Sequence, residues 1–120
     1  MSVMLPVTDV EHWVPKNAVL VSRTNLEVVI NYCNFAFCAI SGYADGELLG
    51  RLHNIIRHPD VPSQYFADCW QCIKSDLPWN GIIKNRCKNG DYYLVEVNVT
   101  PWFEQGEKVG YVSLRYRATR

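Results

Sequence analysis

The stretch that decides the fold covers residues 79–102 and reads WNGIIKNRCKNGDYYLVEVNVTPW. In its second half apolar residues occupy the odd positions from Tyr93 to Val99, while Glu96 and Asn98 point to the other face, which predicts a strand with one buried face. In its first half Ile83 and Asn85 share one face of another strand, and Lys84 lies on the opposite face. Two such strands joined by a short loop containing glycine predict an antiparallel hairpin.

The length of this loop determines which residues face each other. A two-residue Asn-Gly turn would pair odd positions with even ones and would place Glu96 beside Ile83. A three-residue loop at 88–90, with Gly90 left-handed in a bulge, keeps the apolar faces of both strands together. We therefore predict the three-residue loop.

The rest of the chain alternates between short strands and short helices. Asn34 and Gly42 bound the first predicted helix as its N-cap and C-cap. On the last strand we place the even-numbered residues inward, and Arg115 and Arg117 outward. The other predicted elements are strands at 18–22, 26–32 and 109–116, helices at 35–41, 42–50 and 62–75, and a helical turn near 54–57. This order predicts an α+β fold with one five-stranded antiparallel sheet and helices packed on one face.

The composition is typical of a single soluble globular domain. The chain has 120 residues, of which 48% are hydrophobic and 20% charged, and its formal net charge is zero. This balance does not favour nucleic acid as a partner. We find no apolar run that could span a bilayer and no signal peptide. Five cysteines, an odd number, indicate free thiols in a reducing compartment. Residues 1–18 have no clear period and are predicted to form an N-terminal cap before a domain at 19–120.

A polar residue on the apolar face of the hairpin points to a ligand. Asn85 lies on that face, and a buried amide without a partner costs about 1–3 kcal/mol. Its partner could be the backbone, water, or a ligand that offers both a donor and an acceptor. Trp79 opens the same strand, and Phe66 and Trp70 lie on the apolar face of the long helix. These residues predict a flat, aromatic cavity suited to a cofactor ring.

A second candidate region is the rigid stretch from His53 to Pro62. It holds Arg57, His58 and Asp60, and its two prolines restrict the backbone. So many hydrogen-bonding side chains on a short segment favour a binding site. The alternatives are purely structural: Asp60 as the N-cap of the following helix, or Arg57 and Asp60 as a local ion pair.

Phrases along the whole chain from about Leu20 resemble PAS domains. Ser41-Gly42-Tyr43 and the phrase at 47–50 are general PAS features. The Arg-His-Pro-Asp block narrows the resemblance to the PAS sensor of aerotaxis receptors, as do four further phrases, which lie at 78–81, 84–86, 88–91 and 115–119.

This resemblance implies that the chain binds FAD noncovalently and signals the respiratory redox state to a chemotaxis transducer. It would be a cytoplasmic, non-enzymatic domain of an inner-membrane-anchored receptor that acts as a homodimer. Its partners would be a HAMP linker and signalling domains. By resemblance, the residues needed for FAD binding are Arg57, His58 and Asp60, those that line the flavin cavity are Trp79 and Asn85, and further candidates are His53, Asn34, Phe66 and Trp70.

Other functions remain open at this point. The chain could be a PAS interaction module without a cofactor, or a haem-binding oxygen sensor with His58 or His12 as the axial ligand. Cys69 and Cys72 lie mid-helix without a second cysteine pair, so we expect no metal site. The sequence has no glycine-rich phosphate loop and no nucleophile elbow, so we do not expect an enzyme.

Overall fold

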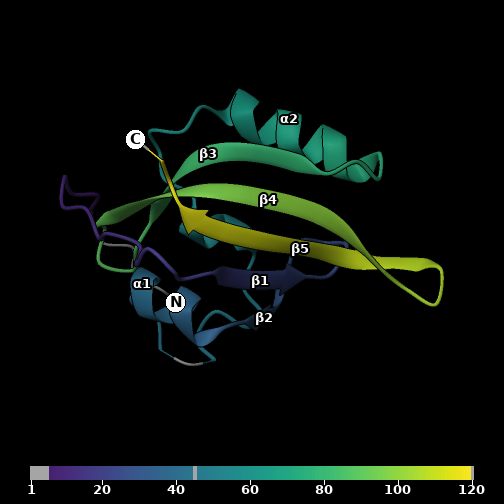
Figure 1. The fold of residues 1–120 in the computed structure, drawn as a ribbon, viewed down its shortest axis with the longest axis horizontal. Coiled ribbons are helices and arrows are strands. Elements are labelled where there is room, and N and C mark those ends of the chain that lie inside the picture. The colour runs from purple at the N-terminus through teal and green to yellow at the C-terminus, as the bar shows by residue number, and fades with distance from the viewer. Residues whose placement is uncertain (1–5, 45, 120) are drawn as a thin grey trace.

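A single antiparallel sheet forms the body of the protein in the computed structural model, which describes residues 6–44 and 46–119 (Figure 1). The five strands are arranged in the order β2-β1-β5-β4-β3. Their bounds are Leu20–Thr24 (β1), Ile30–Cys33 (β2), Trp79–Arg86 (β3), Tyr92–Glu104 (β4) and Glu107–Arg117 (β5). The predicted five-stranded α+β architecture is therefore confirmed.

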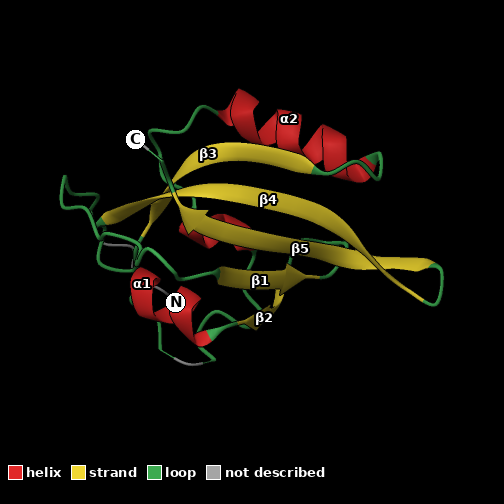
Figure 2. Ribbon diagram, in the orientation of Figure 1, coloured by secondary structure: helices red, strands yellow, loops and turns green. Residues whose placement is uncertain are grey.

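In the chain the helices lie between β2 and β3, and Figure 2 shows them in red. They are α1 (Phe35–Ser41), the 3-10 helix η1 (His53–Ile56) and α2 (Ser63–Lys74). Helix α1 contacts β1 and β4, whereas α2 runs alongside β3 (Figure 1) and contacts β3 and β4. No helix in the described part of the chain is both long enough and apolar enough to cross a membrane.

The β3–β4 hairpin has the register predicted from the sequence. Ile83 pairs with Val95, and Asn85 pairs with Tyr93, so odd positions face odd positions. Gly90 has a φ of 95°, a left-handed conformation that favours glycine. A Cβ atom at this position would collide with the backbone carbonyl of Pro6. The three-residue loop is thus confirmed, and the close approach of the N-terminal segment also requires glycine.

Local signals placed α1 correctly but did not give every boundary. Asn34 Oδ1 accepts a hydrogen bond from the backbone N–H of Phe37, and Gly42 ends the helix with a φ of 81°. The predicted helix at 42–50 is wrong, because residues 46–50 form turns and Asp45 lies outside the described residues. The strand predicted at 26–32 begins only at Ile30. Asn25 explains this, because its side chain accepts from the N–H groups of two nearby residues and holds 25–29 as a turn.

The predicted orientation of β5 is also wrong from Tyr111 to Arg115, although Arg117 is exposed as predicted. The error is important for the site. Tyr111, Ser113 and Arg115 are buried. Arg115 pairs with Val97 of β4, and side chains of paired residues point to the same face of a sheet. Both faces of β5 carry apolar residues, so its own alternation is ambiguous. Pairing with β4, whose buried face is unambiguous, places Arg115 inside.

The N-terminal segment is attached to the start of β4. The backbone N–H of His12 donates to the carbonyl of Tyr92 at 2.7 Å, and the N–H of Tyr92 donates to Val10 at 3.0 Å. Val14 is buried, whereas Trp13 is 57% exposed and lies beneath the guanidinium of Arg117. Part of the predicted cap, residues 1–5, lies outside the described residues.

Candidate functional site

A cavity of about 270 Å³ lies between the helices and the inner face of the sheet. Phe66, Trp70 and Ile73 of α2 form its helical wall, and Val97 and Val99 belong to its sheet wall. Small-molecule sites usually have volumes of roughly 300–1,000 Å³. The cavity therefore has room for a compact ring system, but it is small for a whole dinucleotide.

An open groove continues the cavity on the outside of the protein. It has a volume of about 450 Å³ and shares Asn54 and Arg57 with the cavity. His58 and Arg86 also line it. Cavity and groove together suit a ligand with an apolar ring and a charged extension, because Phe66 and Trp70 line the cavity, whereas Arg57 and Arg86 line the groove.

Asn85 reaches the cavity from near the C-terminal end of β3. Its residue is 3% exposed, and its Nδ2 donates to the carbonyl of Ile56 at 3.4 Å. Its Oδ1 is buried and has no hydrogen-bond partner among the described residues. A buried acceptor without a partner costs about 1–3 kcal/mol, so this amide is suited to bind a ligand N–H group.

A second buried polar residue, Arg115, also lines the cavity and was not predicted. Arg115 of β5 donates to Ser22 Oγ at 3.1 Å and to His53 Nε2 at 3.3 Å. Ser22 Oγ and His53 Nε2 are themselves 2.9 Å apart. Burial and the charge of Arg115 lower the pKa of His53 to about 3, so the imidazole is neutral. His53 lines the cavity as a neutral hydrogen-bonding group, and the positive charge belongs to Arg115 alone.

The Arg-His-Pro-Asp block divides into three separate roles. The guanidinium of Arg57 stacks 3.8 Å from the ring centroid of Phe66, at the boundary between cavity and groove. His58 is 2% exposed, and its Nδ1 accepts from the backbone N–H of Asp60. Burial and the nearby Lys84 lower the pKa of His58. Arg57 therefore faces the ligand space, whereas His58 holds the shape of the loop.

Asp60 has neither of the structural roles considered from the sequence. Helix α2 begins after Pro62 and has no side-chain cap, so Asp60 is not its N-cap. Asp60 accepts from Lys84 Nζ of β3 at 2.8 Å rather than pairing with Arg57. This hydrogen bond from Lys84 lowers the pKa of Asp60. The residue thus attaches the loop to the strand that carries Asn85.

The three aromatic residues among the predicted site residues line the cavity. Asn34, another predicted site residue, does not line it. Trp79 packs edge-to-face on Tyr65, with ring centroids 5.1 Å apart, and Phe66 and Trp70 extend this surface along α2. The Asn34 side chain instead caps α1 and donates to the carbonyl of Val19 at 2.8 Å. Its hydrogen bonds bind β1 to α1, and they leave the residue with a structural role.

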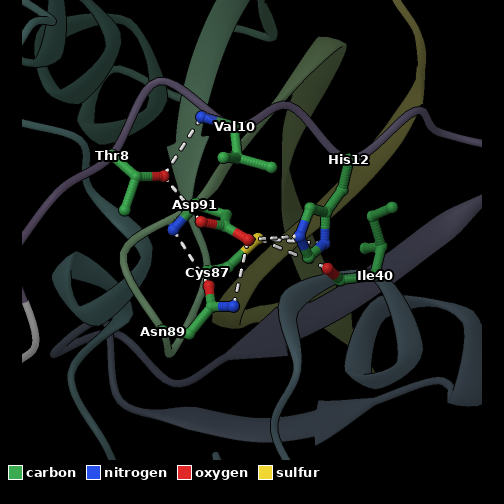
Figure 3. Close-up of polar contacts among 7 residues, drawn as sticks. All are labelled: Thr8, Val10, His12, Ile40, Cys87, Asn89 and Asp91. Atoms are coloured by element: carbon green, nitrogen blue, oxygen red, sulfur yellow. Dashed lines mark hydrogen bonds and ion pairs between the residues drawn. The ribbon is translucent and has the colours of Figure 1, made fainter.

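A Cys-His-Asp arrangement lies at the loop that joins β3 and β4 (Figure 3), and none of its three residues lines the cavity. His12 Nε2 lies 2.7 Å from Asp91 Oδ2, and its Nδ1 lies 3.7 Å from Cys87 Sγ. Cys87 is 1% exposed, and burial raises its pKa to about 12. A reactive cysteine needs a lowered pKa and access to solvent, so this thiol is not a nucleophile. Asp91 also accepts from Thr8 at 2.6 Å, and the group attaches the N-terminal segment.

The fold is that of a PAS domain, and comparison with known proteins establishes the family. Residues 30–115 match the PAS fold family, and the chain belongs to it. It is 48% identical over 100 residues to the aerotaxis receptor of Escherichia coli strain K12, covering 83% of this chain and 20% of the receptor. It is 30% identical over 103 residues to a nitrogen fixation regulatory protein of Klebsiella pneumoniae, covering 85% and 21%. The chain thus spans about a fifth of the length of these relatives.

Solved structures show the same fold at low sequence identity. A PAS domain of a protein from Colwellia psychrerythraea superposes with a TM-score of 0.74 at 20% identity, covering 84% of this chain and 86% of that one. A light-oxygen-voltage domain studied with a flavin analogue gives a TM-score of 0.73 at 17% identity, covering 84% and 76%. The resemblance to PAS sensors noted in the sequence is therefore confirmed.

Proposed function

We propose that this chain is a redox-sensing PAS domain that binds FAD noncovalently and reports respiratory electron flow to a chemotaxis transducer. One observation carries the proposal: the cavity has apolar, aromatic walls, yet Asn85 Oδ1 and Arg115 Nε are buried in it without partners in the described protein. Such groups in an apolar pocket are what a heterocycle with polar edges requires. Similarity to the aerotaxis receptor supports the same assignment.

The residues present fit the isoalloxazine ring and the pyrophosphate of FAD. The isoalloxazine would lie against Phe66, Trp70 and Trp79, with Asn85 accepting a hydrogen bond from a ring N–H and donating from its amide. The pyrophosphate would lie in the outer groove, where Arg57 offers a planar guanidinium suited to phosphate. FAD, when bound, supplies reversible electron uptake, and the side chains hold it, orient it and exclude water from it.

Signalling would depend on the strand that carries Asn85. The backbone of Arg57 bridges to Asn85, so a change in the amide's hydrogen bonds reaches both the ligand loop and β3. A ligand can shift a conformational equilibrium only through different contacts in the two states. A reoriented Asn85 amide would provide that difference and pass it through β3 and β4 to β5.

The proposed location, oligomeric state and partner domains rest on the similarity to the aerotaxis receptor. The chain would be a cytoplasmic domain of an inner-membrane-anchored receptor that forms homodimers, with a HAMP linker and signalling domains as partners. The chain spans about a fifth of the aerotaxis receptor, so these partners would lie in other parts of a longer protein.

The absorption spectrum of the purified protein tests the proposal. We expect the two near-ultraviolet and blue bands of oxidised flavin, and a released chromophore that co-elutes with FAD rather than FMN after denaturation. Arg57→Ala should reduce the bound FAD fraction, whereas Arg23→Ala, which removes a guanidinium stacked on Tyr32 and Trp102 away from the cavity, should not. A colourless protein that fails to bind added FAD would support an interaction module, and a sharp Soret band would support a haem sensor.

A further inference from the structure

Arg115 is a buried cation without an anionic partner. Its residue is 4% exposed, and no Asp or Glu of the described chain forms an ion pair with it. Its hydrogen-bond partners, Ser22 and His53, are both neutral. Buried charges in proteins are normally paired, because an unpaired charge pays the full cost of leaving water. The described part of the protein therefore supplies no counter-ion for this guanidinium.

The hydrogen bonds around Arg115 also leave donors unused. A guanidinium has five N–H donors and no acceptor. Nη1 donates to Ser22, and Nη2 donates to His53, whose Nε2 must therefore be the acceptor of a neutral ring protonated on Nδ1. Nε has no partner among the described residues. Since Arg115 lines the cavity, the donors left over are available to a ligand with an acceptor atom.

The fold holds this charge in place rather than letting it reach solvent. Arg115 lies on β5, the central strand, where it pairs with Leu20 of β1 and Val97 of β4. The ring centroid of Phe37 lies 5.2 Å from its guanidinium carbon. An arginine side chain usually extends to water, but these neighbours prevent that here. The charge is therefore a fixed feature of the cavity.

We propose that Arg115 is the counter-ion for a negative charge that the bound flavin ring acquires on reduction. The inference rests on the proposed FAD binding. One electron without a proton, or two electrons with one proton bonding to N5, leaves one net negative charge on the ring near N1 and the C2 carbonyl. The electrons come from a nicotinamide or quinol donor in the cell and from dithionite in the test. The guanidinium donates hydrogen bonds to that negatively charged edge and makes the second protonation unfavourable.

Near neutral pH none of the groups around Arg115 supplies or removes charge. His53 of η1 has a pKa of about 3. Burial raises the pKa of Cys33 of β2 and of Cys69 of α2 to about 11, and raises the pKa of Tyr93 of β4. The contacts from β1 and α1 are Ser22 and Phe37, which do not titrate. The pH dependence of the flavin midpoint potential near neutrality thus reports the protons taken up by the ring itself.

The test compares the midpoint potential of bound FAD as a function of pH in four proteins. These are the wild type, Arg115→Lys, which keeps the charge, Arg115→Gln, which removes it, and the control Arg117→Gln, which removes an exposed cation from the same strand. We expect less than one proton per electron in the wild type, Arg115→Lys and Arg117→Gln. We expect one proton per electron in Arg115→Gln, and at least a tenfold weaker preference for reduced over oxidised FAD, which is about 30 mV for a two-electron couple.

The outcomes separate this inference from the proposed function. Absence of bound FAD in the wild type contradicts the proposed function. Bound FAD that takes up one proton per electron in the wild type overturns the role of Arg115, even if Arg115→Gln fails to fold or to retain flavin. An Arg115→Gln protein that retains FAD with the proton uptake and potential of the wild type overturns it as well.

Discussion

Replacing Arg115 with methionine should stabilise the protein when flavin has been removed. Methionine fills a similar volume without a charge, and it removes a buried cation that has no counter-ion among the residues that the structure describes. The change removes two hydrogen bonds, one of 3.1 Å to Ser22 and one of 3.3 Å to His53. Ser22 and His53 keep their own hydrogen bond of 2.9 Å. The stability of the flavin-free protein therefore measures what the charge costs.

The expected magnitude follows from these opposing effects. Hydrogen bonds from a charged donor contribute about 1.5–3 kcal/mol each when well formed, and the contact to His53 is long. Desolvating an ion costs several kcal/mol, and replacing buried ionic groups with apolar ones of similar volume often stabilises by about 1–4 kcal/mol. We expect Arg115→Met to raise the free energy of unfolding by about 1–3 kcal/mol, or the Tm by roughly 3–6 °C for each kcal/mol.

The assay is urea unfolding followed by tryptophan fluorescence, on protein stripped of flavin by a chaotropic salt. Arg117→Met is the matched control, because an exposed substitution on the same strand should stay within about 0.5 kcal/mol of the wild type. If Arg115→Met lowers the free energy of unfolding by more than about 1 kcal/mol, the protein itself satisfies the guanidinium, and the argument for an anionic ligand fails.

Three further predictions concern other parts of the molecule. Gly90→Ala should destabilise the protein by about 2–4 kcal/mol in urea unfolding, since it adds a collision with the Pro6 carbonyl to a strained positive φ; Gly106→Ala, with a similar φ but open space, should cost only about 1 kcal/mol, and equal losses would contradict this account. The pKa of His53 falls from 6.5 to about 3 on folding, so its contribution to stability is complete above pH 6.5 and is lost as pH falls toward 3. The stability lost between pH 6.5 and pH 5 should be about 2 kcal/mol. His53→Gln should weaken the pH dependence of the free energy of unfolding by that amount. Asn85→Ala should retain most of the bound FAD but lock or invert the signalling output, and an unchanged redox response would remove Asn85 from the mechanism.

Sequence reasoning identified one end of the cavity and missed the other. Asn85 was found because its hairpin partner has a clear apolar face, and parity then fixes the direction of every residue on the strand. Arg115 was missed because β5 has apolar residues at Val112 and Leu114 as well as at Tyr111. A strand that is apolar on both faces is typical of the centre of a sheet, and this signal could have indicated that a charged residue on β5 is buried.

Contacts between distant segments account for the other differences. Asp60 was weighed as a partner of Arg57, three residues away, but it pairs with Lys84. The position of the N-terminal segment depends on Asp91, which accepts hydrogen bonds from Thr8 and contacts His12. No pattern within either segment indicates these pairs, because each side chain has equally suitable partners nearer in the sequence.

The sequence by itself determined the order of the five strands along the chain, the caps of α1 and the register of the β3–β4 hairpin. These depend on interactions between residues a few positions apart, whose geometry is set by backbone conformation and side-chain alternation. Only the tertiary structure decided that Arg115 lies inside and that no Asp or Glu of the described residues forms an ion pair with it. Burial and charge pairing depend on which strands become neighbours, and β5 lies between β1 and β4, which are far apart in the chain.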